Sequence, residues 1–213
     1  MNEGRNVSAA VVRRLPRYLR LLDDLMSAGL QRTSSGQLGQ ALGLTASQIR
    51  QDLNCFGGFG QQGYGYNVAQ LRGQIAAILG LDRGRTAILI GTGNLGRALC
   101  RNFDFVHAGF SLLAAFDIAP ERVGSLPEHL PLLSIDELDA FVLEKKPDIA
   151  VLTLTREHAA DMAARLAELG VKALWNFTGA DIAQEGVILE SVHFSDSLMT
   201  LSYYVGAESK AVE

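Results

Sequence analysis

The chain has 213 residues, of which 48% are apolar and 20% charged, a composition typical of a soluble globular protein with one large or two modest domains. No apolar run reaches the roughly 18 residues of a membrane-spanning helix, and the first residues lack the features of a secretory signal. Cys55 and Cys100 form neither a metal-binding spacing nor a disulfide framework. We therefore expect a cytoplasmic protein with no membrane partner and no bound metal.

The net charge of −4 is unevenly distributed. Residues 1–84 contain nine arginines and five acidic residues, whereas residues 85–213 contain ten basic and eighteen acidic residues. A basic first half beside an acidic second half suggests that only the first half meets a polyanion. The alternative is ordinary variation of surface charge.

A first helix is predicted between Pro16, which suits the first helical position, and Gly29, which suits a left-handed end. The side chains expected on its core face recur at helical spacing and are Tyr18, Leu19, Leu22, Leu25 and Met26. The segment "TSSGQLGQALG" predicts a short second helix that begins after Ser34 or Ser35 and ends at Gly43.

A third helix is predicted to open with a capping box between Thr45 and Gln48 and to bury Ile49, Leu53 and Phe56. Two helices, a tight turn and a third helix are the outline of a helix-turn-helix. The third helix also offers polar side chains able to hydrogen-bond to base edges in a major groove, namely Ser47, Gln48, Arg50 and Gln51.

The glycine-rich segment "FGGFGQQGYGYN" follows and resembles the hairpin wing of winged-helix proteins. Its candidate DNA contacts are Tyr64, Gly65 and Tyr66. A linking helix, "VAQLRGQIAAILG", then ends at Gly80. We expect a winged-helix DNA-binding domain over residues 1–84; the alternative is a helical packing module that binds no DNA.

A dinucleotide-binding pattern begins the second half. The buried strand "RTAILIG" leads into Gly91, Gly93 and Gly96, which permit a tight turn, approach of a pyrophosphate to the backbone, and close packing of a helix from about Asn94. Asp117 ends the next predicted strand, 21 residues beyond Gly96, where a carboxylate binds the adenosine ribose and repels a 2′-phosphate. NAD(H) is therefore favoured over NADP(H), although Asp117 alone is also compatible with a polar strand end.

The remaining segments alternate between strand and helix, which predicts an α/β Rossmann-type doubly wound parallel sheet over residues 85–195. A helix begins with a capping box at Ser134 and Glu137, and further strands are expected at 148–154, 171–177 and 186–192. Ligands of such sheets lie at the carboxyl ends of the strands. The predicted cofactor contacts are Gly91, Thr92, Gly93, Asn94, Leu95, Gly96, Asp117, Thr153, Thr155, Asn176 and Phe177.

Nothing in the sequence indicates catalysis. The four histidines, His107, His129, His158 and His193, are scattered without an evident acid or base partner, so we expect them to be surface or structural residues. The pattern predicts a binding domain with no catalytic residues.

The last segment, residues 196–213, is predicted to form a helix that is apolar on nearly all sides. Such a helix packs either across its own sheet or between two subunits. We favour a dimerisation helix because a helix-turn-helix protein usually binds two half-sites as a two-fold dimer.

The ordered motifs "RLPRYLRLL", "LTASQIRQDLNCFGGFGQQGYGY", "GTGNLGRAL", "FD", "NF" and "LSYY" resemble the Rex family of bacterial redox-sensing transcriptional repressors over almost the whole chain. The resemblance implies a homodimer with winged-helix and Rossmann domains, NAD(H) as cofactor and a C-terminal helix that exchanges between subunits. It also implies binding to palindromic operator DNA that NADH reverses.

The chain departs from that family at an expected switch. The resemblance implies a hydrogen-bonded trigger of Arg, Tyr and Asp; here Arg20 is kept, whereas Phe103 and His193 stand at the other two positions. Loss of the hydroxyl and the carboxylate puts the preference for NADH over NAD⁺ in doubt.

Other departures concern DNA and the nicotinamide. Gln51, Gln61 and Gln62 replace basic residues usual in the family, which predicts weaker and less salt-dependent DNA binding. Thr155 and Gly179 replace prolines expected near the nicotinamide.

Three hypotheses remain open. The first is a redox-responsive repressor with a modified trigger, and the second is a Rex-like regulator with weak or lost redox discrimination. The third is a small NAD-dependent oxidoreductase or a CoA-binding protein whose helical arm serves only dimerisation.

Overall fold

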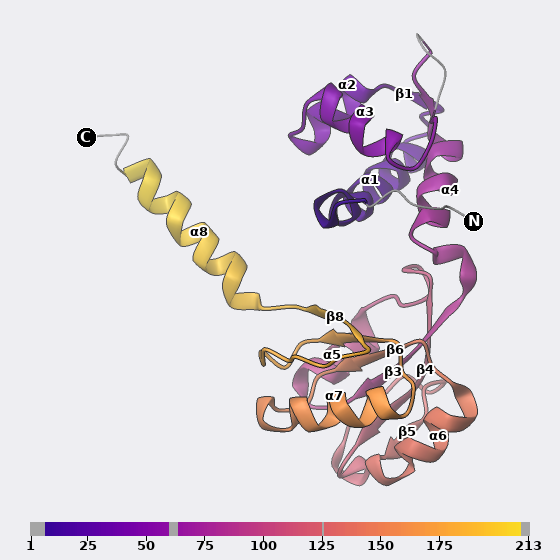
Figure 1. Ribbon diagram of the computed structural model, residues 1–213, viewed down its shortest axis with the longest axis vertical. Helices are drawn as coiled ribbons and strands as arrows, with labels where there is room; N and C mark the ends of the chain where they lie inside the picture. The colour runs from indigo at the N-terminus through magenta and orange to yellow at the C-terminus, as the bar shows by residue number, and fades with distance from the viewer. Residues whose placement is uncertain (1–6, 60–63, 125, 210–213) are drawn as a thin grey trace. The chain divides into compact units, whose positions relative to one another are not determined.

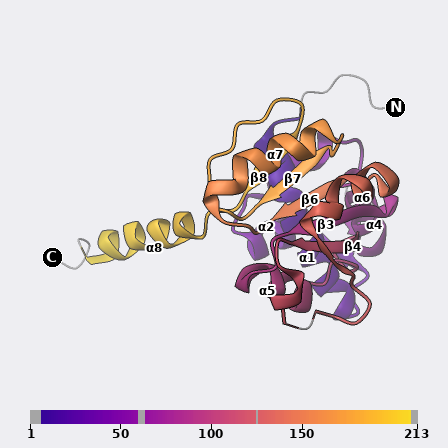
Figure 2. The same cartoon turned by 90° about the horizontal axis from the view of Figure 1, so that it is seen from below.

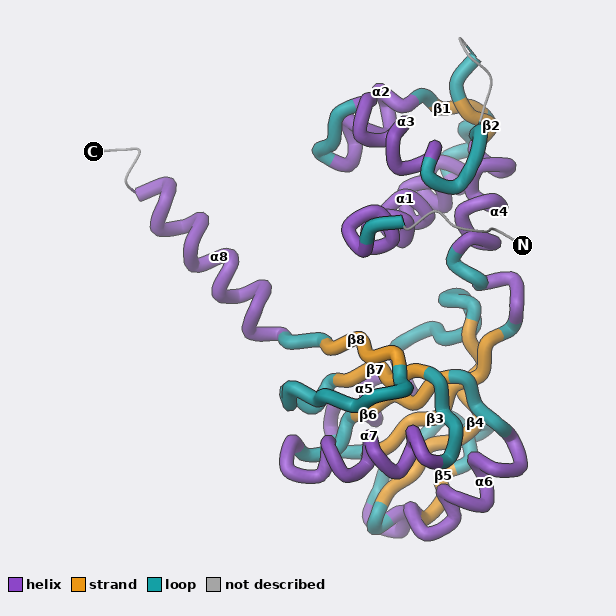
Figure 3. The backbone as a smooth tube through the Cα atoms, viewed as in Figure 1, coloured by secondary structure: helices purple, strands orange, loops and turns teal. Residues whose placement is uncertain are grey.

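The chain divides into two compact units, Met1–Arg83 and Gly84–Glu213. The computed structural model describes residues 7–59, 64–124 and 126–209, without the side chains of residues 207–209. Figure 1 shows the elements in chain order, and Figure 3 shows that the first unit is mainly helical whereas a sheet lies at the centre of the second.

The first unit is a winged helix-turn-helix. Its elements are α1 (Ala9–Ser27), β1 (Arg32–Thr33), α2 (Ser35–Leu42), α3 (Ala46–Asn54), β2 (Tyr66–Asn67) and α4 (Val68–Ile78). Helix α2 packs on α3, α1 packs on α4, and β1 pairs with β2 in antiparallel orientation. The predicted order of helices is therefore confirmed, and the strand that ends the glycine-rich segment pairs with β1, between α1 and α2.

Helix α1 is longer than the sequence predicts. It begins after Ser8, whose side chain accepts a hydrogen bond from the Val11 backbone N–H, and Pro16 lies inside the helix rather than at its start. Pro16 has no N–H to donate to the Val12 carbonyl, and both residues are exposed. Leu15, the residue before Pro16, is buried, and this packing stabilises the helix on that side. Met26, expected on the core face, is 44% exposed.

The ends of α2 follow from its sequence. Ser34 caps the helix in a complete capping box with Gln37, and Gly43 ends it at φ +69°. At the start of α3, the Thr45 hydroxyl accepts from the Gln48 N–H at 3.1 Å, as expected. The Gln48 side chain does not complete the box, because it turns inward to Asp52.

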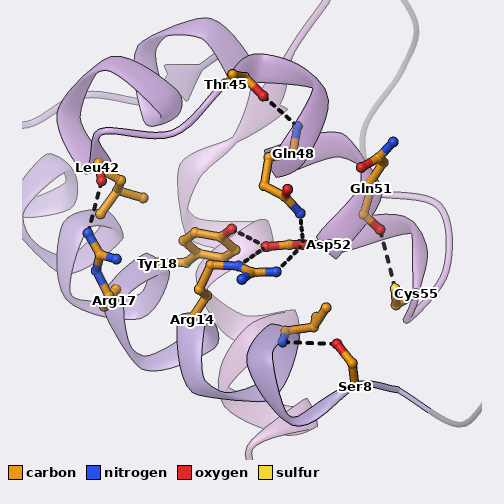
Figure 4. Close-up of polar contacts among 11 residues, drawn as sticks. Ser8, Arg14, Arg17, Tyr18, Leu42, Thr45, Gln48, Gln51, Asp52 and Cys55 are labelled. Carbon is orange, nitrogen blue, oxygen red and sulfur yellow. Dashed lines mark hydrogen bonds and ion pairs between the residues drawn. The ribbon is translucent and has the colours of Figure 1, made fainter.

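Asp52 is the polar centre of the first unit (Figure 4). It is 1% exposed and accepts from Arg14 Nε at 2.6 Å, Arg14 Nη2 at 2.8 Å, Gln48 Nε2 at 2.7 Å and the Tyr18 hydroxyl. Burial opposes its ionisation, but the hydrogen bonds from Arg14, Tyr18 and Gln48 prevail and hold the pKa of Asp52 below its usual value. The ion pair therefore fixes α3 to α1.

The second unit is a six-stranded parallel sheet with helices on both faces. In chain order its elements are β3 (Arg85–Ile90), α5 (Asn94–Asn102), β4 (Phe110–Asp117), β5 (Leu132–Ser134), α6 (Leu138–Lys145), β6 (Ile149–Leu152), α7 (Ala159–Glu168), β7 (Ala173–Asn176), β8 (Ile188–Ser191) and α8 (Phe194–Ser209). The strand order is β5-β4-β3-β6-β7-β8. This order is that of a Rossmann fold, as predicted.

The two faces of the sheet have separate cores. Ile88 and Ile90 belong to the core that includes residues of α6 and α7, whereas Leu89 belongs to the core that includes α5. Figure 2 shows α5 on the opposite side of the sheet from α6 and α7. The alternation of side chains along β3 therefore places one helix layer on each face.

Two elements differ from the sequence prediction. The short edge strand β5 was not expected, because three residues after Pro131 carry no periodic pattern; its position is decided by pairing with β4. Helix α8 begins at Phe194, two residues earlier than expected. Its exposed apolar side chains are Phe194, Leu198, Met199, Leu201, Tyr203, Tyr204 and Val205.

Within the described parts of the chain, no helix combines the length and the apolar character that crossing a bilayer requires.

Replacement of Asp52 by Asn should destabilise the first unit by about 3–5 kcal/mol, because it leaves the Arg14 guanidinium without its buried counter-ion. Far-UV circular dichroism during urea denaturation follows the helices of both units, so Asp52→Asn should shift only the part of this signal that comes from the first unit. The fluorescence of Trp175, the single tryptophan, reports the second unit and should keep its wild-type transition. Asp24→Asn, at an exposed position of α1, is the matched control.

The same ion pair gives the effect a pH dependence. A carboxyl group whose pKa is lower in the folded state stabilises above its unfolded pKa of about 3.9, and this stabilisation is lost as the pH falls through the folded pKa. The difference between wild type and Asp52→Asn should therefore be full near pH 7 and shrink below about pH 4. A difference that stays constant in acid would show that folding does not lower the pKa of Asp52.

Candidate functional site

The glycine-rich turn lies at the point where the strand order of the sheet reverses, between β3 and β6. Gly91 follows β3, and its N–H donates to the Phe116 carbonyl at 2.8 Å. Thr153 follows β6, and its hydroxyl donates to the Gly91 carbonyl at 2.6 Å. In parallel α/β sheets this edge is where ligands bind.

The three glycines of the turn have different structural roles. Gly91 has φ +94°, and a Cβ there would lie 2.8 Å from the Leu154 nitrogen. A Cβ on Gly96 would collide with the Gly91 carbonyl oxygen, so Gly96 lets α5 approach the turn. Gly93 has open space around it and stands at the start of α5 with no side-chain cap. The first and third glycines therefore shape the turn, whereas the second leaves the helix N-terminus open to an anion.

A cavity of about 500 Å³ adjoins the turn. Gly91 and Gly93 form one side, and Asp117 lies at the end of β4. Further lining residues come from the loops after β4 and β6, from the residue before α7 and from α7 itself, and include Ile118, Leu154, Thr155, His158, Asp161, Met162 and Arg165. An apolar cavity with a few polar groups suits a planar ring with hydrogen-bonding edges.

The residues of α7 were not among the predicted contacts. His158, Asp161, Met162 and Arg165 recur three or four residues apart, which places them on one side of a helical segment. That spacing in the sequence could have indicated a shared face, but only the packing of α7 beside the carboxyl end of β6 places this face at the cavity. His158, expected to be a surface residue, is exposed and lines the cavity.

Asp117 is held by the turn itself. Its Oδ2 accepts from the Thr92 N–H at 2.7 Å and from the Thr92 hydroxyl at 2.6 Å, and its Oδ1 accepts from the Ala119 N–H at 3.1 Å. Burial opposes ionisation, but these hydrogen bonds outweigh it and keep the pKa of Asp117 below its usual value. Thr92, predicted as a cofactor contact, is 2% exposed and its hydroxyl binds Asp117 instead.

Asn176 also differs from expectation. It is 1% exposed, its Nδ2 donates to the Ala180 carbonyl and to Ser191 Oγ, and its Oδ1 accepts from the N–H and hydroxyl of Thr178. These four bonds occupy the amide group, so the side chain braces the loop after β7 rather than facing a ligand. Phe177 packs on Trp175 with ring centroids 4.5 Å apart.

The other predicted cofactor residues lie around the turn. Thr155 is exposed at the cavity and Thr153 lines it while bonding to the Gly91 carbonyl. Asn94 is exposed and its Oδ1 accepts from Arg97, whereas Leu95 is half-buried.

The exposed side of α3 presents three of the four predicted DNA contacts. Ser47, Arg50 and Gln51 are exposed, and Arg50 Nη1 donates to Ser35 Oγ at 3.0 Å. Gln48 is half-buried, and its amide Nε2 is bound to Asp52. This hydrogen bond helps to hold Asp52, the residue that joins α3 to α1.

The wing residues do not share one surface. Tyr64 is 69% exposed, and the Arg32 guanidinium lies 5.9 Å from its ring centroid. Gly65 has φ +69°, and a Cβ would collide with the Thr33 carbonyl. Tyr66, predicted as a DNA contact, is 9% exposed and packs in the core, because β2 pairs with β1. Arg32 is an exposed cation here that the sequence patterns did not single out.

Gln61 and Gln62, the other departures expected to affect DNA binding, lie outside the described residues.

The expected switch residues lie in both units. Phe103 is 37% exposed, with ring centroids 4.8 Å from Phe105 and 5.5 Å from Trp175. His193 Nε2 lies 3.7 Å from Asp181 Oδ1. Arg20 is exposed on α1, in the other unit. A joint contact of the three residues remains a prediction.

Over the described residues, no group of three or more His, Cys, Asp and Glu side chains forms a candidate metal site.

Two family models match the chain, one in each unit. Residues 6–54 match the family described as "Putative DNA-binding protein N-terminus", and residues 82–180 match the CoA binding domain family. These matches cover the helix-turn-helix and most of the parallel sheet.

Curated relatives match over nearly the full length. A redox-sensing transcriptional repressor Rex of Clostridium beijerinckii is 47% identical over 95% of this chain and 97% of its own. One of Clostridioides difficile is 48% identical over 94% of this chain and 96% of its own, and one of Thermoanaerobacter pseudethanolicus is 46% identical over 98% and 93%.

Solved structures agree with the curated relatives. RSP in complex with β-NAD⁺ and operator DNA is 46% identical with a TM-score of 0.88 over 95% of this chain and 94% of its own. RSP in complex with β-NADH is 42% identical with a TM-score of 0.88 over 98% and 99%, and a further RSP structure is described as a Rex-family repressor. The chain therefore belongs to the Rex family of redox-sensing transcriptional repressors.

Proposed function

We propose that this protein is a transcriptional repressor that releases operator DNA when NADH binds. The observation that carries the proposal is the presence, in one chain, of an exposed α3 surface suited to a major groove and a glycine turn beside Asp117 suited to NAD(H). Solved relatives hold β-NAD⁺ with operator DNA in one case and β-NADH in another.

The proposal includes a cytoplasmic homodimer on a palindromic operator. Helix α8 supports it, because apolar side chains along its length are exposed in the single chain and a second copy would bury them. Two recognition helices related by two-fold symmetry meet successive major grooves when their spacing matches one helical turn of DNA.

NADH acts in this proposal through a difference of affinities. A ligand shifts the balance between DNA-binding and released states only if it binds one of them more tightly. The dinucleotides differ at the nicotinamide ring, so discrimination arises near the ends of β6 and β7. Of the side chains there, Asn176 is fully hydrogen-bonded within its own loop and Thr153 is bound to the turn.

A second candidate function is that of a regulator that responds similarly to NAD⁺ and NADH. Phe103 supports it, because its aromatic contacts with Phe105 and Trp175 include no hydroxyl for a trigger. His193 supports it as well, because its Nε2 faces Asp181.

Operator binding of the full chain, titrated separately with NAD⁺ and NADH at low salt, distinguishes the functions. Release by NADH at concentrations where NAD⁺ has no effect supports the redox-responsive repressor. Equal responses to both support the second function. No binding to any Rex-type operator would instead favour an oxidoreductase or a CoA-binding protein.

Gly93→Val should abolish NADH binding and NADH-induced release while leaving operator binding intact. The new side chain occupies the space before the α5 N-terminus that a pyrophosphate needs, yet its Cβ meets no atom within 4 Å beyond its own chain neighbours. NADH fluorescence and operator titration measure the two effects.

Gly96→Val is the contrasting variant, because its Cβ would collide with the Gly91 carbonyl. It should lower the unfolding midpoint reported by Trp175 as well as NADH binding. If Gly93→Val still responds to NADH, the dinucleotide binds elsewhere.

Arg50→Ala should weaken operator binding by about 1–3 kcal/mol if the guanidinium contacts a guanine in the major groove. Binding to a scrambled duplex should fall much less, because loss of a base contact reduces specificity rather than general affinity for phosphate. Unchanged operator affinity would remove Arg50 from the interface.

Gln51→Lys should strengthen binding to operator and scrambled DNA alike. Gln51 is exposed on α3, and a lysine there adds one charge that can meet a phosphate. The slope of log K against log salt should steepen by about one for each lysine that contacts a phosphate. Affinity measured from 50 to 200 mM salt tests this, and Gln51→Met, which keeps about the same side-chain length without adding a charge, is the control.

A further inference from the structure

The residue between the first two glycines of the turn has an unusual environment. Thr92 is 2% exposed, although it stands between Gly91 and Gly93, which both line the cavity. Its N–H and its hydroxyl both donate to the same atom, Asp117 Oδ2, at 2.7 and 2.6 Å. The glycines account for the shape of the turn, and no feature of that shape requires a hydroxyl at Thr92.

These bonds restrict how Asp117 presents its carboxylate. Oδ2 receives two donors from Thr92, and Oδ1 receives the Ala119 N–H at 3.1 Å while keeping further lone-pair capacity. The carboxylate therefore has a fixed orientation in which Oδ1 is the oxygen with more capacity for a ligand hydroxyl. Asp117 lines the cavity beside Gly91 and Gly93.

We propose that the Thr92 hydroxyl is a positioning group for Asp117 and thereby determines the preference of this protein for NADH over NADPH. The inference rests on the proposed dinucleotide binding. It assigns Thr92 no contact with the cofactor.

The physical reason is the geometry of repulsion and of hydrogen bonding. A fixed carboxylate accepts the ribose hydroxyls of NADH and repels the 2′-phosphate of NADPH, which carries nearly two negative charges. Without the Thr92 hydroxyl, one of the donors to Oδ2 is lost and the carboxylate can turn away from the ribose. The affinity for NADH then falls, because its ribose loses a well-placed acceptor. The affinity for NADPH falls less or rises, because its 2′-phosphate meets less repulsion.

The test is the ratio of NADH to NADPH affinity of the full chain, measured by cofactor fluorescence. Thr92→Val keeps the side-chain shape and removes only the hydroxyl. We expect its ratio to fall roughly three- to tenfold below that of the wild type, the effect of one ordinary hydrogen bond, because the Thr92 N–H still donates to Oδ2. Thr92→Ser keeps the hydroxyl and should keep the wild-type ratio.

A second pair of variants controls for changes in side-chain packing. Thr92→Ala and Thr92→Ser both remove the methyl group and differ only in the hydroxyl, so a lower ratio in the alanine variant than in the serine variant supports the inference. Trp175 fluorescence during unfolding establishes that each variant is folded. In the background of Asp117→Asn, where there is no carboxylate to position, Thr92→Val should cause no further change of the ratio.

Two results would overturn the inference. One is an unchanged ratio in both variants without the hydroxyl. The other is an equal loss of affinity for both cofactors, which indicates a structural role alone. Absence of NADH binding in the wild type is a different outcome, because it contradicts the proposed function rather than the role of Thr92.

Discussion

The close approach of three backbone segments at the carboxyl edge of the sheet is the constraint on which the second unit depends. Gly96 brings α5 against the Gly91 carbonyl, and Thr153 donates its hydroxyl to that same carbonyl at 2.6 Å. A side chain at either glycine would separate these segments. The cavity, the open N-terminus of α5 and the placement of Asp117 all follow from this contact.

The first unit depends in a similar way on one buried carboxylate. Asp52 joins α3, which presents Arg50 and Gln51, to α1 through its ion pair with Arg14. Arg20, the expected switch residue of this unit, also lies on α1. Asp52 is buried and accepts two hydrogen bonds from the Arg14 guanidinium, so this ion pair holds α1 and α3 together within the unit.

Phe103 and His193, which the family resemblance places at an expected switch, lie outside the glycine turn and the strands of the sheet. Phe103 extends an aromatic group that includes Trp175 and Phe177, and His193 faces Asp181. Aromatic packing of Phe103 and a contact of His193 with Asp181 thus stand where the family resemblance implies a hydrogen-bonded trigger. The glycine turn and the parallel sheet are unaffected, which is why dinucleotide binding and redox discrimination can be tested as separate properties.

Local signals in the sequence determined much of this protein: the caps at Ser34 and Ser134, the left-handed end at Gly43, and the strand, glycine turn and helix around Gly91. These features depend on residues a few positions apart, so sequence alone specifies them. Only the tertiary structure decided that α1 continues through Pro16, that β5 joins the sheet, and that Thr92, Asn176 and Tyr66 turn inward. Each of these outcomes depends on partners distant in the chain, and burial against such partners outweighs local preference.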